Sequence, residues 1–318
     1  MRAIGIERFG DTPGLMERPV PEPGPGEVQI AVDAASTNPL DVVIAAGGLA
    51  AVGEYRFPLT LGMDGAGTVT ALGAGVTEFR VGDRVFGQFW GRPLQSGTFA
   101  EVCVVAAAPA FGALMAIPGA VPSHLAAALP TAGMTALGVL DRLQVPEGGT
   151  LLVIGGTGGV GTFAVQAAAA RGIHVIATAS AQLAEPVREL GAAEIAVRGG
   201  KPLGDALGGS VDAVLDAVGD RSITRSVAGA VKDGGALFSI AYGLDEPLLA
   251  DERIRTANYE LERKPELLAE LAELVTAGTI RPVIGATLPL EEAPRALAGQ
   301  VEVTGLRGKT VLQIGASV

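Results

Sequence analysis

The sequence is poor in the side chains that bind transition metals. Its 318 residues include one cysteine, Cys103, and two histidines, His124 and His174. A catalytic zinc ion needs three protein ligands, mostly Cys and His, and a structural zinc ion needs four. We therefore expect no metal site. A single cysteine also excludes an intramolecular disulfide, which fits a reducing, cytoplasmic setting.

Basic residues and uninterrupted apolar segments are also scarce. The chain has 23 Lys and Arg against 34 Asp and Glu, a formal net charge of −11, and no run of four basic residues. Nucleic-acid binding requires clustered basic side chains, so we expect no nucleic-acid partner. Residues 102–123 carry no charge, but Pro109, Pro118 and Pro122 interrupt them, and the N-terminal MRAIGIERFG lacks an apolar signal core. A membrane-spanning helix needs about 20 apolar residues without such breaks, so we expect no membrane segment.

The pattern of the chain changes near residue 121. Before it, short alternating runs are separated by Gly and Pro: EVQIAVDAA, GAGTVTALG, DRVFGQF and TFAEVCVVA. Such runs are typical of a small antiparallel barrel or sandwich. From about residue 124, strand-like runs such as TLLVIGG, HVIATAS and EIAV alternate with helical ones, and RIRTANYEL (253–261) is a candidate sixth strand. This alternation predicts a parallel sheet with right-handed crossovers.

The C-terminal part changes again. PELLAELAELVTAG places Leu267, Leu271, Leu274 and Val275 on one helical face that ends at Gly278. RPVIGATLPL and KTVLQI then read as strands that return to the first domain. We therefore predict an α/β protein in which a doubly wound parallel sheet is inserted in a β-barrel domain, with a cleft between the two.

The stretch TLLVIGGTGGVGTFAVQAAAARG contains a nucleotide-binding pattern. Gly156, Gly158 and Gly161 fit G-x-G-x-x-G between a strand and a helix. We expect Gly156 to form the tight turn, Gly158 to let the backbone approach a diphosphate, and Gly161 to let the helix pack closely. The helix N-terminus would offer N–H groups to the phosphates. We predict cofactor contacts along the whole turn, at Gly156, Thr157, Gly158, Gly159, Val160 and Gly161; a purely structural glycine turn is the alternative.

No acidic residue ends the second strand of this unit. HVIATAS finishes at Thr178-Ala179-Ser180, where NAD-binding proteins usually carry an Asp or Glu for the ribose 2′-hydroxyl. A carboxylate would repel a 2′-phosphate, so the sequence favours NADPH over NADH. Ser180 and Arg198 are the predicted phosphate contacts, with Lys201 and Arg188 as weaker candidates. The alternatives are a helix N-cap for Ser180 and a solvated surface residue for Arg198.

Several other residues are candidates for the site. Asn38 is either a hydrogen-bond donor near the nicotinamide or substrate oxygen, or a structural turn cap before Pro39. Tyr242 is expected at the end of a strand on the crevice side, or in the core. Tyr55 and Trp90 are candidates for lining the pocket. We expect further cofactor contacts at Thr135, Val218 and Ala241, with a helix-cap role as the alternative for Thr135, and structural rather than acid-catalytic roles for Asp41 and Asp64.

Six stretches follow one another in an order typical of an enzyme family: NPLDVVIAAG (38–47), PLTLGMDGAGTVTALG (58–73), VGDRVFG (81–87), LPTAGMTAL (129–137), GGTGGVG (155–161) and RGKTVL (307–312). Together they resemble the zinc-independent medium-chain dehydrogenase/reductases, in the quinone oxidoreductase and ζ-crystallin branch. The resemblance implies a GroES-like catalytic domain of residues 1–121 and 263–318 around a Rossmann domain of residues 122–262. It also implies NADPH-dependent reduction and a homodimer.

The comparison with that family also brings out differences. Zinc-dependent members have Cys where Asn38 stands and His-Glu where Met63-Asp64 stand. The quinone reductase branch often has Tyr and Arg at the places of Val43 and Ala45, and Lys near Gln182 and Leu183, shortly after Ser180. The difference at Val43 and Ala45 means that the resemblance does not define the substrate. The difference near Gln182 and Leu183 moves the expected phosphate contact toward Ser180 and Arg198.

The sequence therefore predicts a metal-free, NADPH-dependent oxidoreductase that delivers hydride to a small-molecule electron acceptor, a quinone or an α,β-unsaturated carbonyl. Without a metal, polarisation of the substrate depends on hydrogen bonds and on the position of the nicotinamide. One alternative is an enoyl or ketone reductase acting on a biosynthetic intermediate. Another is a non-catalytic NADPH-binding protein of a structural or redox-sensing kind.

Overall fold

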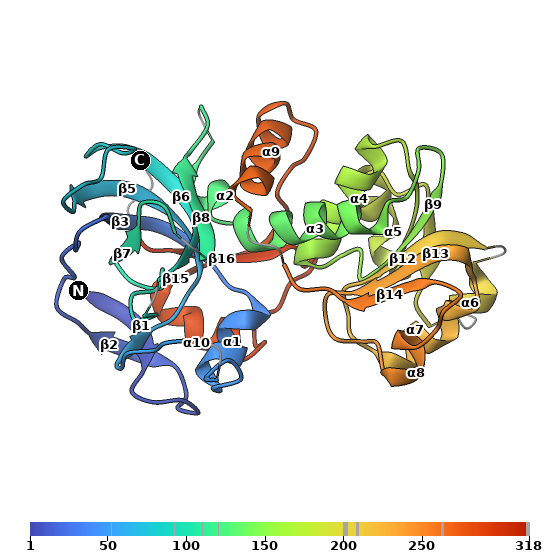
Figure 1. Ribbon diagram of the computed structural model, residues 1–318, viewed down its shortest axis with the longest axis horizontal. Helices are drawn as coiled ribbons and strands as arrows, with labels where there is room; N and C mark the ends of the chain where they lie inside the picture. The colour runs from blue at the N-terminus through green and yellow to red at the C-terminus, as the bar shows by residue number, and fades with distance from the viewer. Residues whose placement is uncertain are drawn as a thin grey trace.

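The alternating runs of the N-terminal third fold into a barrel lobe, shown on the left in Figure 1. The computed structural model describes residues 1–51, 53–91, 93–109, 111–119, 121–199, 203–207, 210–261 and 264–315. In the barrel lobe, one sheet has the order β2-β1-β4, and a seven-stranded sheet has the order β15-β16-β3-β5-β6-β8 with β7 paired to β3. The strands are β1 (Arg2–Ile6), β2 (Gly14–Glu17), β3 (Glu27–Ser36), β4 (Leu59–Thr60), β5 (Asp64–Leu72), β6 (Arg84–Trp90), β7 (Val102–Ala106), β8 (Phe111–Ala116), β15 (Ile284–Pro289) and β16 (Lys309–Gln313).

The register of the large sheet brings polar side chains into one buried row. Ser36 at the end of β3 is opposite Asp64 at the start of β5, and Asp64 is opposite Gln88 on β6. All three residues are fully buried, although strand interiors of this kind are normally apolar. Buried polar groups need hydrogen-bond partners, so this row is a candidate for a functional polar network.

The second lobe is a six-stranded parallel sheet, shown on the right in Figure 1. Its order, β11-β10-β9-β12-β13-β14, confirms the doubly wound fold and the sixth strand. The strands are β9 (Thr150–Ile154), β10 (His174–Ala179), β11 (Glu194–Val197), β12 (Val211–Asp216), β13 (Val231–Ser239) and β14 (Arg255–Asn258). The helices of this lobe are α4 (Gly159–Ala170), α5 (Ala184–Glu189), α6 (Leu203–Ala206), α7 (Arg221–Ala228) and α8 (Glu246–Leu249).

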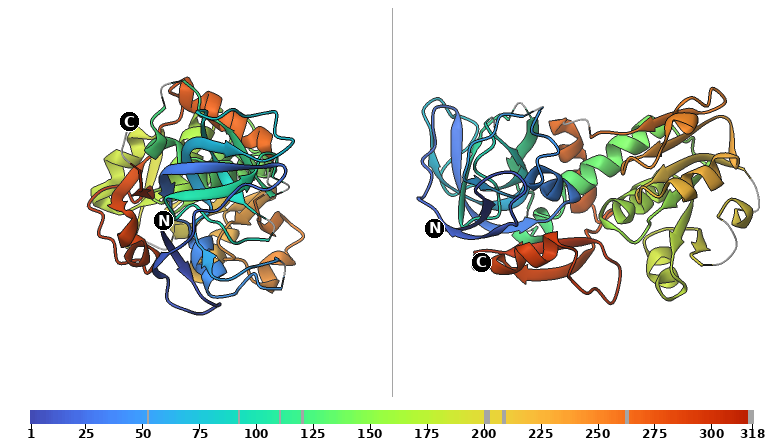
Figure 2. Two further views of the ribbon diagram at one scale, coloured as in Figure 1. Left: turned by 90° about the vertical axis from the view of Figure 1, so that its left-hand side faces the viewer. Right: turned by 90° about the horizontal axis from the view of Figure 1, so that it is seen from below.

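Strands from both ends of the chain meet in the barrel lobe. Strand β16 pairs antiparallel with β3 and parallel with β15, so the C-terminal strands return as expected. Figure 2 shows them, coloured red, beside the N-terminal strands. The uncharged stretch 102–123 forms β7, β8 and the beginning of α2 (Ser123–Ala126). None of the described helices is long and apolar enough to cross a bilayer. The domain limits at 121/122 and 262/263 stay a prediction, and residues 262 and 263 lie outside the described residues.

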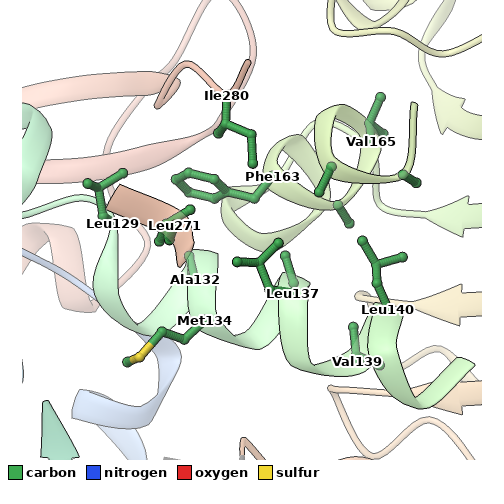
Figure 3. Packing of buried hydrophobic residues seen from close by; sticks show 14 of the residues in the cluster. Leu129, Ala132, Met134, Leu137, Val139, Leu140, Phe163, Val165, Leu271 and Ile280 are labelled. Atoms are coloured by element: carbon green, nitrogen blue, oxygen red, sulfur yellow. The ribbon is translucent and has the colours of Figure 1, made fainter. Parts of the chain in front are cut away.

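Helix α3 (Pro130–Leu143) connects the two lobes. It begins beside β6 and runs against α4, and α9 (Pro265–Thr276) packs across it and against β8. In this core, Leu137 of α3, Phe163 of α4 and Leu271 of α9 are buried together (Figure 3). Gly133 allows the close approach, because a Cβ there would lie 2.2 Å from Leu271 Cδ2. The smaller helices α1 (Pro39–Ala45) and α10 (Ala293–Leu297) complete the barrel lobe.

The packing of Leu271 can be tested by truncation. Leu271 is fully buried, so Leu271→Ala leaves a cavity, and we expect the free energy of unfolding to fall by about 2–5 kcal/mol. Leu249→Ala is the matched control, because Leu249 is 44% exposed; it should cost less than about 1 kcal/mol. Urea unfolding followed by circular dichroism measures both. Equal losses in the two variants would contradict the packing described.

Candidate active site

A cleft of about 1160 Å³ runs between the two lobes. On one side it is lined by the turn after β9 and by the loops after β12 and β13, at the carboxyl ends of the parallel strands. Ligands bind at these ends of the strands in doubly wound sheets, so the cleft lies where we expected the ligand crevice. On the other side it is lined by α1, β6 and residues 307–310. The volume exceeds that of an ordinary small-molecule pocket, and leaves room for a dinucleotide beside a substrate.

The glycine turn differs from expectation in one detail. Gly155, not Gly156, takes the left-handed conformation, with φ +93°, although Gly156 does lie in the turn that the hydrogen bond from Gly158 N to Gly155 O closes at 3.1 Å. Gly156 serves a different need, since a Cβ there would lie 2.9 Å from Ala177 Cβ on β10. The prediction for Gly161 fits, because a Cβ there would lie 2.1 Å from Gly155 O and would push α4 off the turn.

The start of α4 forms a cradle that fits a diphosphate. Gly158, Gly159, Val160 and Gly161 line the cleft, and the first amides of a helix have no partners within the helix. A Cβ on Gly158 would meet only Gly155 O, at 3.6 Å, so this backbone faces open space that a side chain would fill. Gly156 and Thr157 are not cleft-lining residues, and Thr157 O instead accepts a hydrogen bond from Gly308 N at 3.0 Å. Of the six cofactor contacts predicted in this turn, the four from Gly158 to Gly161 therefore line the cleft.

Parallel pairing of β10 and β11 brings the two predicted phosphate contacts together. The Arg198 N–H donates to Ala179 O at 2.9 Å, directly before Ser180. Ser180 occupies an N-cap position, but its side chain makes no capping bond. The Arg198 side chain is exposed and has no ion pair within the described part of the chain. Neither residue lines the main cleft.

The other predicted contacts of this region fall in different places. Arg188 forms an ion pair with Glu185, and Lys201 lies outside the described residues. Val218 is 52% exposed beside the glycine turn, where its Cγ2 would lie 3.0 Å from a Cβ on Gly155. Ala241 lines the cleft.

Asp64 is the centre of a buried polar network at the cleft. Its carboxylate accepts hydrogen bonds from Thr131 Oγ1 at 2.6 Å, from Thr131 N at 3.2 Å and from Asn38 Nδ2 at 3.0 Å. Thr131 is in the first turn of α3, where the helix dipole also favours a negative charge. Burial raises the pKa of Asp64, while Lys309 and the hydrogen bonds from Thr131 and Asn38 oppose that shift. These contacts fit the structural role expected for Asp64.

Asn38 stands at the N-cap position of α1 and forms a capping box with Asp41, whose Oδ2 accepts from Asn38 N at 2.7 Å. Its Nδ2 donates to Asp64, and its Oδ1 accepts a hydrogen bond from Lys309 Nζ. Lys309 also donates to Thr37 O at 2.9 Å and is only 4% exposed. Burial lowers the pKa of Lys309, and the carboxylates of Asp64 and Asp41 oppose the shift. The Asn38 side chain therefore contacts Asp64 and Lys309 while the residue also takes part in the cap of α1, so the turn-cap role does not exclude the site role.

Sequence reasoning missed Lys309, Thr131 and Gln88 as site residues. The first two lie within the quoted stretches RGKTVL and LPTAGMTAL, which was the one available signal. Gln88 had none, because it sits in an ordinary strand pattern. Its Nε2 donates to Thr131 Oγ1 at 2.7 Å, while its buried Oε1 has no partner among the described residues. Gln88 lines the cleft, so its wall contains an acceptor without a protein donor.

The remaining candidates line the same cleft. Tyr242 is on the crevice side as expected, but it lies three residues beyond the end of β13, with φ +56°, and at 58% exposed it is not in the core. Its hydroxyl donates to Glu260 at 2.7 Å. Tyr55 donates to Leu49 O at 3.2 Å. Thr135 lies inside α3 and donates to Thr131 O at 2.6 Å, so it caps nothing. Trp90 also lines this cleft.

The donor atoms in the structure are unsuited to a transition metal. Across the described residues, no group of three or more His, Cys, Asp or Glu side chains is arranged to hold an ion. Cys103 is buried in β7, and burial raises its pKa to about 12, which disfavours the thiolate that metals require. His174 instead bonds Glu194 at 2.8 Å, at the N-terminal end of β10. Asn38 and Asp64 direct their side chains to Lys309 and Thr131 rather than to a shared centre.

Asp41 is a buried carboxyl next to the network. Its Oδ2 accepts a hydrogen bond from Asn38 N at 2.7 Å, while Oδ1 has no partner within the described ranges. Burial raises the pKa of Asp41 to about 7, and the negative charge of Asp64 acts in the same direction. The pKa of Asp41 is thus well above its usual range, although Asp41 does not line the cleft. This combination is compatible with the structural role expected for it.

The pKa of Asp41 predicts a pH dependence of stability. The folded chain keeps this proton up to about pH 7, whereas the unfolded chain loses it near 3.8. Between these values the folded state binds more protons, so wild-type stability falls as pH rises. Asp41→Asn keeps a neutral side chain. It should gain on the order of 2–4 kcal/mol relative to wild type as pH rises through this window, and keep the gain above it.

Urea unfolding at roughly pH 5 and pH 8 measures the difference. Asp233→Asn, at a side chain that is 85% exposed, is the control. A gain for Asp41→Asn that is the same at both pH values would contradict this account of the buried carboxyl.

Comparison with known proteins finds dehydrogenases and oxidoreductases, which agrees with a cofactor cradle in the cleft. The family model of the alcohol dehydrogenase GroES-like domain matches residues 24–118, and that of the zinc-binding dehydrogenase matches residues 190–312. The mitochondrial NAD(P)H oxidoreductase RTN4IP1 of Mus musculus is 33% identical over 340 aligned positions, which cover 91% of this chain and 82% of the relative.

Solved structures extend the likeness to the whole fold. The quinone oxidoreductase from Coxiella burnetii superposes with a TM-score of 0.87 at 28% identity, over 99% of both chains. A mycobacterial protein solved in complex with NADPH superposes with a TM-score of 0.81 at 29% identity, over 98% of this chain and 100% of that one. The fold, the glycine turn and these relatives together identify the chain as a member of the medium-chain dehydrogenase/reductase family, in its quinone oxidoreductase branch, and as an oxidoreductase with a nicotinamide cofactor.

Proposed function

We propose that this protein is an NADPH-dependent oxidoreductase that reduces a quinone or an α,β-unsaturated carbonyl without a metal ion. The observation that carries the proposal is the pair formed by Asn38 and Lys309 in the cleft wall, in the same cleft as the glycine turn. It puts hydrogen-bond donors and a buried positive charge in the cleft that holds the cofactor cradle. The names of the quinone oxidoreductase and NAD(P)H oxidoreductase relatives support the same chemistry.

The residues that would hold the cofactor come from the sheet lobe. The amides of Gly159, Val160 and Gly161 would bind the diphosphate at the positive end of the α4 dipole. Ser180 and Arg198 would bind the 2′-phosphate, Arg198 through its planar donor fork. When bound, NADPH supplies a hydride from C4 of its nicotinamide. The absence of an acid at residues 178–180 favours NADPH, because a carboxylate there would repel the phosphate.

The residues that would act on the substrate come from the barrel lobe. Hydride addition to a conjugated acceptor moves electron density onto an oxygen atom, which hydrogen-bond donors stabilise until a proton from water or a side chain completes the reduction. Asn38 Nδ2 carries a second hydrogen beyond the one donated to Asp64, and Asn38 lines the cleft. The nearby Lys309 ammonium would further stabilise negative charge on the substrate oxygen, because electrostatic interactions are stronger in a buried site with little water.

Tyr242 and Tyr55 remain proposed substrate contacts. Both hydroxyls already donate their hydrogens, to Glu260 and Leu49 O respectively, so each would have to exchange that bond to serve a substrate. The hydrogen bond to Glu260 raises the pKa of Tyr242 and keeps its proton in place. The homodimer and the cytoplasmic location stay predictions.

Steady-state oxidation of NADPH, followed at the absorbance of the cofactor, tests the proposal. We expect turnover with 1,4-naphthoquinone or with small enones in enzyme treated with a chelator, because donors rather than a metal polarise the acceptor. Tight NADPH binding without turnover of any acceptor would favour a non-catalytic binding protein. Activity that appears only on added zinc would overturn the metal-free mechanism.

The choice of cofactor is tested at Ser180. Ser180→Asp places a carboxylate at the end of β10, so it should repel the 2′-phosphate and accept from the ribose hydroxyl of NADH. We expect kcat/KM for NADPH to fall by about 10–100-fold, and that for NADH to rise. Ser226→Asp introduces the same charge at an exposed position of α7, and is the control. A wild-type preference for NADH, or an unchanged ratio in Ser180→Asp, would contradict the assignment.

A further inference from the structure

We infer that Lys309 is a positioning residue that fixes the side-chain amide of Asn38, so that Asn38 offers an N–H and not a carbonyl oxygen to the substrate. The inference rests on the proposed function for the meaning of that N–H. Its structural part, the orientation of one amide by one ammonium group, stands on contacts between residues of this chain.

A carboxamide has two ends of nearly equal size but opposite hydrogen-bonding character. Rotation by half a turn exchanges a donor for an acceptor, with little change in shape. A free Asn38 could therefore present either Nδ2 or Oδ1 to the cleft. Only Nδ2 would stabilise negative charge on a substrate oxygen, and Oδ1 would repel it. The orientation of this amide therefore decides whether Asn38 helps or hinders the reaction.

Two neighbours with opposite, unambiguous character hold the amide. An ammonium group only donates, and Lys309 Nζ donates to Oδ1. The carboxyl oxygens of Asp64 both accept from Thr131 N, and Oδ2 also accepts from Asn38 Nδ2 at 3.0 Å. The reversed amide would bring donor against donor at Lys309 and acceptor against acceptor at Asp64. Lys309 occupies Oδ1, and leaves the second hydrogen of Nδ2 as the polar group that Asn38 has left to offer.

The position of Lys309 is itself determined from two sides. Its ammonium donates to Thr37 O at 2.9 Å and lies 3.7 Å from Asp64 Oδ2. Its stem lies against the cofactor cradle, because a Cβ on Gly159 would come within 3.1 Å of Lys309 Cδ. The backbone next to it is bound to the same turn through the Gly308 N–H and Thr157 O. Lys309 thus joins the donor Asn38 to the turn that would carry the diphosphate.

The first test is a double-mutant cycle. Lys309→Met keeps an unbranched stem against Gly159 and removes the ammonium. We expect a loss of kcat of about tenfold or more with 1,4-naphthoquinone, and a dissociation constant for NADPH within about threefold of wild type. In an Asn38→Ala background, Lys309→Met should have little further effect, because the residue it positions is gone. Full additivity of the two losses would overturn the proposal in favour of a direct or merely structural action of Lys309.

Lys309→Met leaves the buried Asp64 charge without its counter-ion, and so could unfold the chain. Lys309→Met combined with Asp64→Asn removes both charges and keeps the test usable. This double variant should be folded by circular dichroism, bind NADPH and still show the loss of kcat. Wild-type kcat in this double variant would overturn the proposal.

A third readout does not depend on activity. In ¹⁵N relaxation measurements, the side-chain amide of Asn38 should be as rigid as the backbone in the wild type and more mobile in Lys309→Met. An equally rigid amide in both would overturn the positioning role. The proposed function fails separately, if wild type turns over no acceptor or if Asn38→Ala keeps full activity.

Discussion

The arrangement of the cleft depends on one buried carboxylate, that of Asp64. Its donors come from α1, from the first turn of α3 and, at longer range, from β16, so segments far apart in the sequence meet at one group. A buried negative charge is costly unless its acceptor positions are filled, and here Thr131 and Asn38 fill them. Because α3 also carries the core between the lobes, the position of the carboxylate and the position of the sheet lobe are linked.

The site occupies the positions where zinc-dependent relatives are expected to bind their metal, but its side chains have a different chemistry. Where zinc-dependent members of the family have Cys and His-Glu, this chain has Asn38 and Met63-Asp64. Asn38 donates one hydrogen bond to Asp64 and accepts one from the ammonium group of Lys309. Lysine is a fixed donor and not a Lewis acid with an open coordination position. Under the proposed function, this difference would favour acceptors whose oxygen is stabilised by hydrogen bonds over reactions that need a strongly polarised alcohol.

Periodicity and spacing predicted most of the fold, but only part of the site. The sheet order and the returning strands followed from alternation and turn residues, because those signals are local in the sequence. The sequence did not show that Gly155 rather than Gly156 has the positive φ, because adjacent glycines satisfy the same pattern and only the backbone dihedral distinguishes them. Lys309, Thr131 and Gln88 were missed because their role arises from contacts between distant segments, and each looks ordinary in its own segment. Tyr242 was placed on a strand because an apolar run continues past the point where pairing with β14 ends.

The hydrogen bond between Gly308 and Thr157 has a consequence for the order of events during synthesis of the chain. The glycine turn leaves the ribosome about 150 residues before the strand that supports it, at the usual pace many seconds earlier. Until residue 309 has emerged, the turn lacks both the hydrogen bond from Gly308 and the lysine stem that lies against Gly159. At that stage Asn38 lacks the ammonium group that donates to its Oδ1 in the folded protein. The order of the segments thus places the glycine turn well before the lysine that packs against it.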